Sequence, residues 1–325
     1  MRLKQLFPTW IGLLLWVMLI QTAAIAESHT VATVGGEPLT LELEVPPGKG
    51  PFPVIAWIHG GAWQAGSHKQ MPGLTRDALE RGFAVASLDY RLTSEAGKWG
   101  EEPVTWPAQL HDIKAGIRWL RANAKELKLD PNRIVVWGAS AGGHLATMAG
   151  LTSGEPAFEG TVGNNLESSS EVALAVDFFG PTELFLMDQD VTTPPGSAIE
   201  HNAIDSPESR LVGSQEHGYS LGTIRAHAQD SAAPWPRLNA AVRSASPVHQ
   251  VDSDDRVPLY IAHGKRDRLI AFTQAQRLQR ACKEHGVPHQ VRWYDKAGHG
   301  LPREAHLDVF VWITTTWTPD NPAID

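Results

Sequence analysis

The sequence predicts an α/β fold in which a mostly parallel β-sheet carries helices on both faces. Short runs of successive apolar residues alternate with longer segments whose apolar residues recur at helical spacing. Runs that are apolar on both sides are typical of strands in a sheet that helices cover on each face. The expected strands are 54–58, 83–88, 134–137, 173–179, 259–262 and 290–294.

Three helices and a hairpin are also expected. Apolar residues at helical spacing predict a helix over 110–120, a second over 273–285 and a third that follows His299. Residues 30–45 alternate between apolar and polar around Gly35-Gly36, which predicts an antiparallel hairpin before the parallel strands.

The N-terminal segment 1–26 has the pattern of a signal peptide. Arg2 and Lys4 give it a basic start, an apolar stretch follows, and Ala24-Ile25-Ala26 supplies a small-x-small cleavage pattern. The apolar stretch is shorter than the roughly 20 residues that span a bilayer, although an uncleaved anchor is the alternative. We therefore expect residues 27–325 to form one exported domain, periplasmic or secreted, without stable membrane association.

Residues 182–246 are expected to form an irregular insertion within this domain. The segment contains no sheet-like run and is interrupted by prolines. We expect loops and short helices that cover the sheet edge, where such excursions often form the wall of a substrate site. The prolines are Pro194, Pro195, Pro207, Pro234 and Pro236.

The composition argues against several partners and cofactors. The formal net charge is −8, whereas nucleic acids and anionic membranes attract clustered Lys and Arg, so neither is an expected partner. The scattered histidines form no H-E-x-x-H pattern or similar ligand cluster, so no metal and no other cofactor is expected. Cys282 is the only cysteine, which excludes an internal disulfide, and we expect it to be a structural thiol in a helix.

A nucleophile motif follows the expected strand 134–137. The residues are Gly138-Ala139-Ser140-Ala141-Gly142, and the next segment opens a helix. G-x-S-x-G between a strand and a helix is the nucleophile elbow, a sharp turn that raises the serine above the sheet edge. We therefore expect Ser140 to be the nucleophile. The alternatives are a turn of small residues without chemistry and a dinucleotide-binding glycine pattern, which the downstream Asp and His disfavour.

The base and the acid should follow the serine in the order acid, then histidine. His299 lies between two glycines just after the last expected strand, and it is the expected base. Asp267 follows the strand 259–262 in a loop at the same sheet edge, and we expect it to orient His299 and to stabilise its positive charge. Asp295, which is close to His299 in sequence, is the alternative acid.

The segment His59-Gly60-Gly61-Ala62-Trp63 directly follows the strand 54–58 and has the composition of an oxyanion loop. Glycines allow backbone amides to turn toward a developing negative charge. The expected donors are the amides of Gly61, Ala62 and Ala141. Trp63 is a candidate for the substrate-binding wall, although core packing would explain a tryptophan there equally well.

These motifs together resemble those of the hormone-sensitive-lipase-like branch of the α/β-hydrolases. Within it, the sequence is most similar to bacterial esterases grouped with bifunctional feruloyl and acetylxylan esterases. The segments Asp89-Tyr90-Arg91-Leu92 and Ser206-Pro207-Glu208-Ser209-Arg210-Leu211 share that resemblance. Two departures are Ala62, in place of a third glycine, and Ala139, where many relatives carry an acidic or hydroxyl residue.

We therefore expect a serine carboxylesterase with the α/β-hydrolase fold. The resemblance implies short-acyl or hydroxycinnamoyl esters, in a small molecule or linked to polysaccharide. A lipase for longer acyl chains, an amide hydrolase like acylaminoacyl peptidases or formamidases, and an inactive binding protein remain alternatives. An inactive binding protein is disfavoured because every motif that the reaction needs is present. The natural ester and the oligomeric state remain open.

Overall fold

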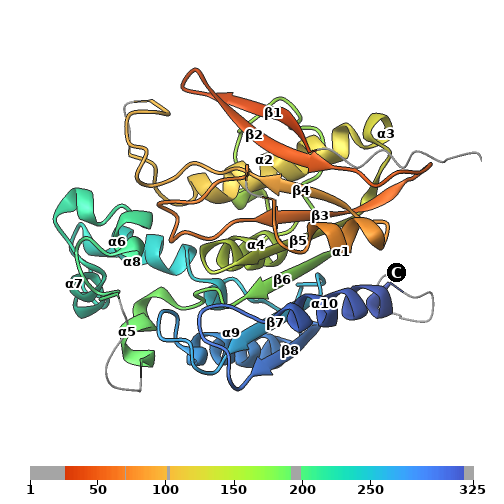
Figure 1. The fold of residues 1–325 in the computed structure, drawn as a ribbon. Helices are drawn as coiled ribbons and strands as arrows, with labels where there is room; N and C mark the ends of the chain where they lie inside the picture. Colours follow the sequence, from red (N-terminus) through yellow and green to blue (C-terminus); the bar gives the residue numbers. More distant parts are fainter. Residues whose placement is uncertain (1–25, 70, 101–102, 192–198, 318–325) are drawn as a thin grey trace, which may run out of the picture.

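The computed structural model describes residues 26–69, 71–100, 103–191 and 199–317. Within them, eight strands form one sheet in the order β1-β2-β4-β3-β5-β6-β7-β8. Its mostly parallel character confirms the predicted α/β-hydrolase fold (Figure 1). The strands are β1 (Glu27–Val34), β2 (Glu37–Glu44), β3 (Phe52–Ile58), β4 (Ala84–Leu88), β5 (Leu129–Ala139), β6 (Leu174–Phe178), β7 (Leu259–Gly264) and β8 (His289–Tyr294).

The first two strands form the predicted hairpin at one edge of the sheet. β1 pairs with β2, and β2 with β4, in antiparallel fashion, whereas all pairs from β4 through β8 are parallel. The turn needs glycine at Gly35 because its φ is 57° and a Cβ there would overlap the backbone of Trp99. The carboxyl ends of the parallel strands therefore all lie along one border of the sheet, its carboxyl edge, where the loops that follow these strands can converge.

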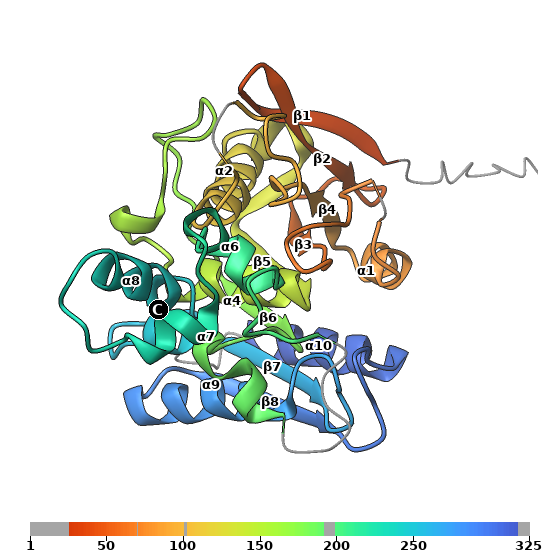
Figure 2. The same ribbon diagram turned by 90° about the vertical axis from the view of Figure 1, so that its left-hand side faces the viewer.

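Helices cover both faces of the sheet (Figures 1 and 2). On one face lie α2 (Ala108–Ala122), α4 (Ala141–Leu151) and α9 (Phe272–His285), whose apolar side chains belong to one buried cluster. On the other face, α10 (Arg303–Thr316) packs with the segment around α1 (Thr75–Glu80) in a second cluster. The short α3 (Ala124–Leu127) follows α2, and η1 (Pro156–Phe158) follows α4.

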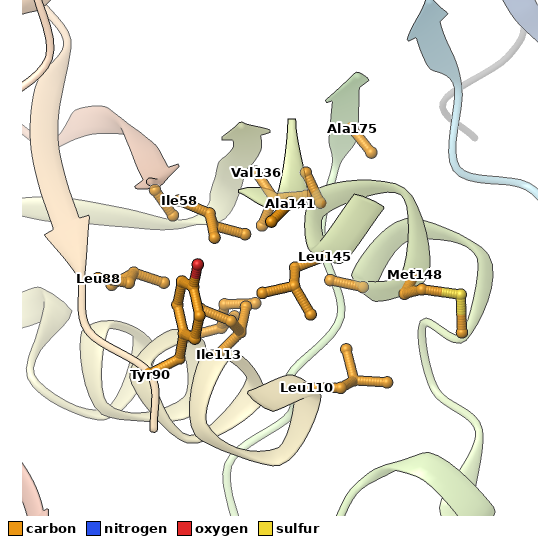
Figure 3. Close-up of a cluster of buried hydrophobic side chains, with 14 of the residues drawn as sticks. Ile58, Leu88, Tyr90, Leu110, Ile113, Val136, Ala141, Leu145, Met148 and Ala175 are labelled. Carbon is orange, nitrogen blue, oxygen red and sulfur yellow. The ribbon is translucent and has the colours of Figure 1, made fainter. Parts of the chain in front are cut away.

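Helix α4, which begins directly after Ser140, is enclosed on every side. All of its residues are buried, because α2 packs on it as the sheet does (Figure 3). Leu145 and Met148 contribute its largest apolar side chains to this cluster. Truncating such a side chain to alanine typically costs about 2–5 kcal/mol of unfolding free energy, so the position of α4 is strongly specified.

The described part of residues 182–246 consists of short helices and loops and contains no strand. Asp190 anchors it to α9 through an ion pair with Arg277 (2.5 Å) and a hydrogen bond from Gln274 (2.8 Å). In Figure 1, α6, α7 and α8 lie together to the left of the sheet. The described helices of the insertion are η2 (Leu184–Leu186), α5 (Met187–Asp190), α6 (Pro207–Leu211), η3 (Gln215–His217), α7 (Leu221–Ala226) and α8 (Trp235–Ser244), and η4 (Pro247–His249) follows the insertion.

The expected signal peptide lies, apart from Ala26, outside the described residues. Within the described ranges, no helix has the length and apolar character needed to cross a membrane.

Candidate active site

Ser140 occupies the sharp turn between β5 and α4, at the carboxyl edge of the sheet. Its φ of 57° and ψ of −124° are strained for a residue with a side chain. Its amide donates to the carbonyl oxygen of Phe178 (2.8 Å), which holds the turn against β6. A Cβ on Gly138 would overlap the backbone of Gly142, and one on Gly142 would overlap the carbonyl oxygen of Ile58. The small residues of the motif are therefore required by space.

His299 joins Ser140 to Asp267. Its Nε2 lies 3.0 Å from the Ser140 Oγ, and its Nδ1 lies 2.8 Å from the Asp267 Oδ2. Because a carboxylate only accepts, Nδ1 carries a proton and neutral His299 presents an unprotonated Nε2 to the serine hydroxyl. The loop between β8 and α10 thus brings an imidazole nitrogen that can accept a proton within reach of the serine hydroxyl.

The side chain of Asp267 is fully buried and has four possible hydrogen-bond donors around it. Its Oδ1 accepts from the amides of Leu269 (2.8 Å) and Ile270 (3.0 Å), while Oδ2 faces His299 and, at 3.4 Å, His263 Nε2. Burial alone would raise the pKa of Asp267, but the hydrogen bonds and charges of the two histidines outweigh it and hold the pKa well below its usual value. Asp267 is therefore an ionised carboxylate in a preorganised setting.

The alternative acid, Asp295, lies elsewhere. It pairs with Lys265 at 2.6 Å, and its side chain is 78% exposed. The structure places Asp267, and not Asp295, beside the His299 ring.

The predicted oxyanion loop passes directly over the serine turn. A Cβ on Gly60 would come within 3.3 Å of the Ser140 Cβ. Gly61, Ala62 and Trp63 all have positive φ (111°, 55° and 57°), a conformation that costs energy at the last two positions. Of the three expected amide donors, Ala62 and Ala141 line the same small cavity as Ser140, whereas Gly61 is not among its lining residues.

Trp63 is mainly a packing residue. It lines the cavity, but only 1% of it is exposed, and its Nε1–H donates to the His144 Nδ1 (3.3 Å). The His144 Nε2 in turn bonds the carbonyl oxygen of Ala245 (2.7 Å). His144 therefore connects α4 to the oxyanion loop and to the end of the insertion.

Two residues around His299 were not foreseen as part of the site. His263 contacts Asp267, and the Phe179 ring packs edge-on against the imidazole of His299 at 4.8 Å between centroids. Phe179 has a φ of 47°, which is unusual for a residue with a large side chain. His263 could have been suspected from its position four residues before Asp267, whereas Phe179 sits at the end of an ordinary apolar strand and carries no such signal.

Across the part of the chain that the structure describes, no group of three or more His, Cys, Asp or Glu side chains could hold a metal ion. Cys282 is buried in α9, and burial raises the pKa of its thiol to about 12. The chemistry that these residues support is acyl transfer through the serine hydroxyl.

Curated relatives of this chain are named esterases. Esterase LipC of Mycobacterium tuberculosis is 28% identical over 258 residues, which cover 77% of this chain and 53% of LipC. A probable carboxylic ester hydrolase of the same species, LipM, is 28% identical over 270 residues, covering 81% of this chain and 53% of LipM. The chain thus spans about half the length of these relatives.

Solved structures share the fold. A truncated carbohydrate esterase from gut microbiota superposes with a TM-score of 0.69 at 28% identity and covers 89% of this chain and 96% of that one. A bifunctional GH43-CE protein of Bacteroides eggerthii gives 0.67 at 26% identity, over 86% of this chain and 33% of that one. The family described as BD-FAE matches residues 41–282, from β2 to α9. The chain therefore belongs to the BD-FAE family, within the hormone-sensitive-lipase-like branch of the α/β-hydrolases.

Proposed function

We propose that this protein is a serine hydrolase of carboxylic esters, and that its substrates carry short acyl or hydroxycinnamoyl groups. The observation that carries the proposal is the continuous contact from Ser140 through His299 to the buried Asp267. The curated relatives named esterases support the same reaction class.

In the first half of the reaction, His299 Nε2 takes the hydroxyl proton as the Ser140 Oγ attacks the ester carbonyl carbon. The carbonyl oxygen becomes an oxyanion, and the amides of Gly61, Ala62 and Ala141 stabilise it. When the carbon–oxygen bond to the alcohol breaks, His299 donates its proton to the leaving oxygen. Ser140 is left as an acyl ester.

In the second half, water replaces the alcohol. His299 takes a proton from the water as the water oxygen attacks the acyl carbon. It then returns a proton to the Ser140 Oγ as the bond between that oxygen and the acyl carbon breaks, and the carboxylic acid is released. Asp267 keeps the Nδ1 proton in place and stabilises the imidazolium that forms in both halves. Its low pKa suits this role, because it remains ionised while His299 becomes charged.

The cavity at Ser140 favours small groups. It holds about 20 Å³, which is room for roughly one water-sized group. Its lining comes from the serine turn, the oxyanion loop, the insertion and the loop after Asp267. We infer that acetyl esters fit better than long acyl chains.

The lipase alternative has weaker support. Among the acidic residues of the insertion, Glu200 and Asp205 are exposed. Asp190 and Glu208 are buried partners of Arg277 and His201 and add no surface charge. The exposed large apolar side chains of the described residues, Leu166, Ile204 and Val311, lie at separate places in the sequence. A broad apolar surface for lipid droplets has no support among them. An amide hydrolase would use the same triad, so only the substrate that the protein hydrolyses distinguishes this alternative from an esterase.

We further propose that the protein is exported, with residues 1–26 removed. The basic start, the apolar stretch and the Ala24-Ile25-Ala26 pattern support it. N-terminal sequencing of the secreted or periplasmic form tests it, and an intact N-terminus on the exported protein would contradict it.

The proposed reaction is tested with purified protein and its Ser140→Ala variant. We expect the wild type to hydrolyse acetyl and butyryl esters faster than palmitoyl esters, and to react covalently with a fluorophosphonate. Ser140→Ala should do neither. A preference for palmitoyl esters with activation at an oil–water interface would favour the lipase alternative, and hydrolysis of formyl or aminoacyl amides alone would favour the amide hydrolase.

A further inference from the structure

A buried carboxylate from the insertion lines the cavity at Ser140. Glu208, near the start of α6, and His201, which precedes that helix, are each only 1% exposed, and both border the cavity. The Glu208 Oε1 lies 2.8 Å from the His201 Nδ1, while His201 Nε2 bonds the carbonyl oxygen of Leu269 at 3.0 Å. The pair thus connects the insertion to the loop that carries Asp267.

The protonation of this pair follows from its partners. The carbonyl oxygen of Leu269 can only accept, so His201 Nε2 carries a proton. One more proton then lies between Nδ1 and the Glu208 Oε1. Burial would lower the pKa of His201, but the hydrogen bond and the charge of Glu208 outweigh it and raise the pKa above its usual value. The pair is accordingly an imidazolium and a carboxylate.

The second carboxylate oxygen, Glu208 Oε2, is left without a hydrogen-bond donor among the described residues. Such a buried acceptor is uncommon in folded proteins, and a charged one forms strong, short hydrogen bonds when a donor reaches it. Other polar groups of α6 are paired. The Ser206 hydroxyl caps the helix, and the Ser209 hydroxyl donates to the carbonyl oxygen of Ala203. Glu208 Oε2 is therefore a buried acceptor without a donor, on a side chain that lines the cavity.

We propose that Glu208 is a specificity-determining residue whose Oε2 accepts a hydrogen bond from a hydroxyl group of the ester substrate. The proposal rests on the proposed esterase function. The cavity has room for roughly one water-sized group, so the part of the substrate that enters it is small. The hydroxyl can belong to the alcohol part, as in a partly acetylated sugar, or to a short hydroxyacyl group.

Two substrate series separate these sources. The first compares a monoacetylated methyl xyloside that has free neighbouring hydroxyls with its O-methylated counterpart. The second compares 4-nitrophenyl glycolate with the methoxyacetate, which matches its electronic character, and with the propionate, which matches its size. In one of the series we expect kcat/KM to be about ten- to a hundredfold higher for the hydroxyl form, as a hydrogen bond to a charged acceptor provides.

The variant Glu208→Gln changes the free acceptor into an N–H donor of the same shape. A methyl ether can accept from it, so the preference for the hydroxyl form should fall toward one or invert. The matched control is Glu183→Gln, since Glu183 is also a buried glutamate of the insertion that pairs with a histidine (His249, 2.8 Å) but does not line the cavity. This control should keep the wild-type preference.

Equal kcat/KM for the hydroxyl and the capped forms in both series of the wild type would overturn the proposal, and this needs no folded variant. An unchanged preference in folded Glu208→Gln would also overturn it. Hydrolysis of simple acetates without such a preference would leave the esterase function intact. A wild type that hydrolyses no ester would contradict the proposed function itself.

Discussion

Replacing Asp267 with Asn is the perturbation for which the structure predicts the largest effect from the smallest change. The carboxylate is surrounded by donors: two backbone amides at Oδ1, and His299 Nδ1 and His263 Nε2 at Oδ2. An asparagine side chain has one acceptor oxygen and one NH2 group. In one orientation the NH2 group faces the two backbone amides, and in the other it faces the two histidine nitrogens. Either way a donor replaces a carboxylate oxygen that accepted hydrogen bonds.

The least costly relief is a change of tautomer in His299. With its proton moved to Nε2, the His299 Nδ1 can accept from the asparagine NH2 group, but Nε2 can no longer take the Ser140 proton. The equivalent change in a serine protease lowers kcat about ten-thousandfold through the wrong tautomer, and we expect a loss of kcat/KM of that order here. His263 can keep its hydrogen bond to the carbonyl oxygen of Ile270, so the fold should survive.

The assay is kcat/KM for 4-nitrophenyl acetate, with fluorophosphonate labelling and the melting temperature measured in parallel. The matched control is Asp295→Asn, which removes an exposed ion pair with Lys265 and should change the rate less than about twofold. A folded Asp267→Asn protein that keeps a tenth of wild-type activity would refute the reasoning. So would a large loss in Asp295→Asn.

Three further predictions concern the serine, the pH dependence of stability and the wall beside His299. Ser140→Ala should lower kcat by at least about a thousandfold while the melting temperature stays within a few degrees, because removal of a triad nucleophile costs several powers of ten; residual turnover of a few per cent would contradict it. Burial lowers the pKa of His144 to about 4, below its ordinary unfolded value of 6.5. Below pH 6.5 the unfolded chain therefore binds a proton at His144 that the folded protein does not bind, so the free energy of unfolding decreases as the pH falls toward 4, by about 2 kcal/mol between pH 7 and 5. In urea unfolding, the free energy of unfolding of His144→Gln should change by about 2 kcal/mol less between pH 7 and 5 than that of the wild type. The same change in both proteins would refute the assignment of this pH dependence to His144. Phe179→Ala should lower kcat about ten- to a hundredfold with KM little changed, since the ring that packs against His299 is lost; Phe179→Leu should restore part of the rate, and an unchanged kcat in Phe179→Ala would show that the ring does not position His299.

The sheet and the position of the serine turn were predictable because local patterns determine them. Strands in a covered parallel sheet must be apolar on both sides, so β3 through β7 are apparent as short runs in the sequence. Gly138 and Gly142 are required by backbone contacts that any nucleophile elbow would make. Chain order along a parallel sheet then places Asp267 and His299 at the same edge as Ser140.

Long-range packing was not predictable in the same way. Nothing in the sequence around Trp63 or His144 indicates that the two side chains form a hydrogen bond across 81 residues. Nothing near Phe179 indicates its left-handed backbone conformation or its contact with His299. Such contacts depend on how whole helices and loops pack, and apolar periodicity carries no information about which polar groups meet there.

The same distinction separates the proposed reaction from its specificity. The groups proposed for bond making and breaking lie on loops that directly continue sheet strands, where geometry repeats across the fold and a short motif is informative. Glu208 and His201 lie in the insertion, about 60 to 70 residues from both Ser140 and Asp267 in sequence, and they reach the cavity only because the insertion folds back over the sheet edge. The ion pair of Asp190 with Arg277 ties the other end of that insertion to α9. If Glu208 has the proposed role, substrate choice depends on how the insertion is held in place, and changes there should alter the preferred ester without altering the groups at Ser140.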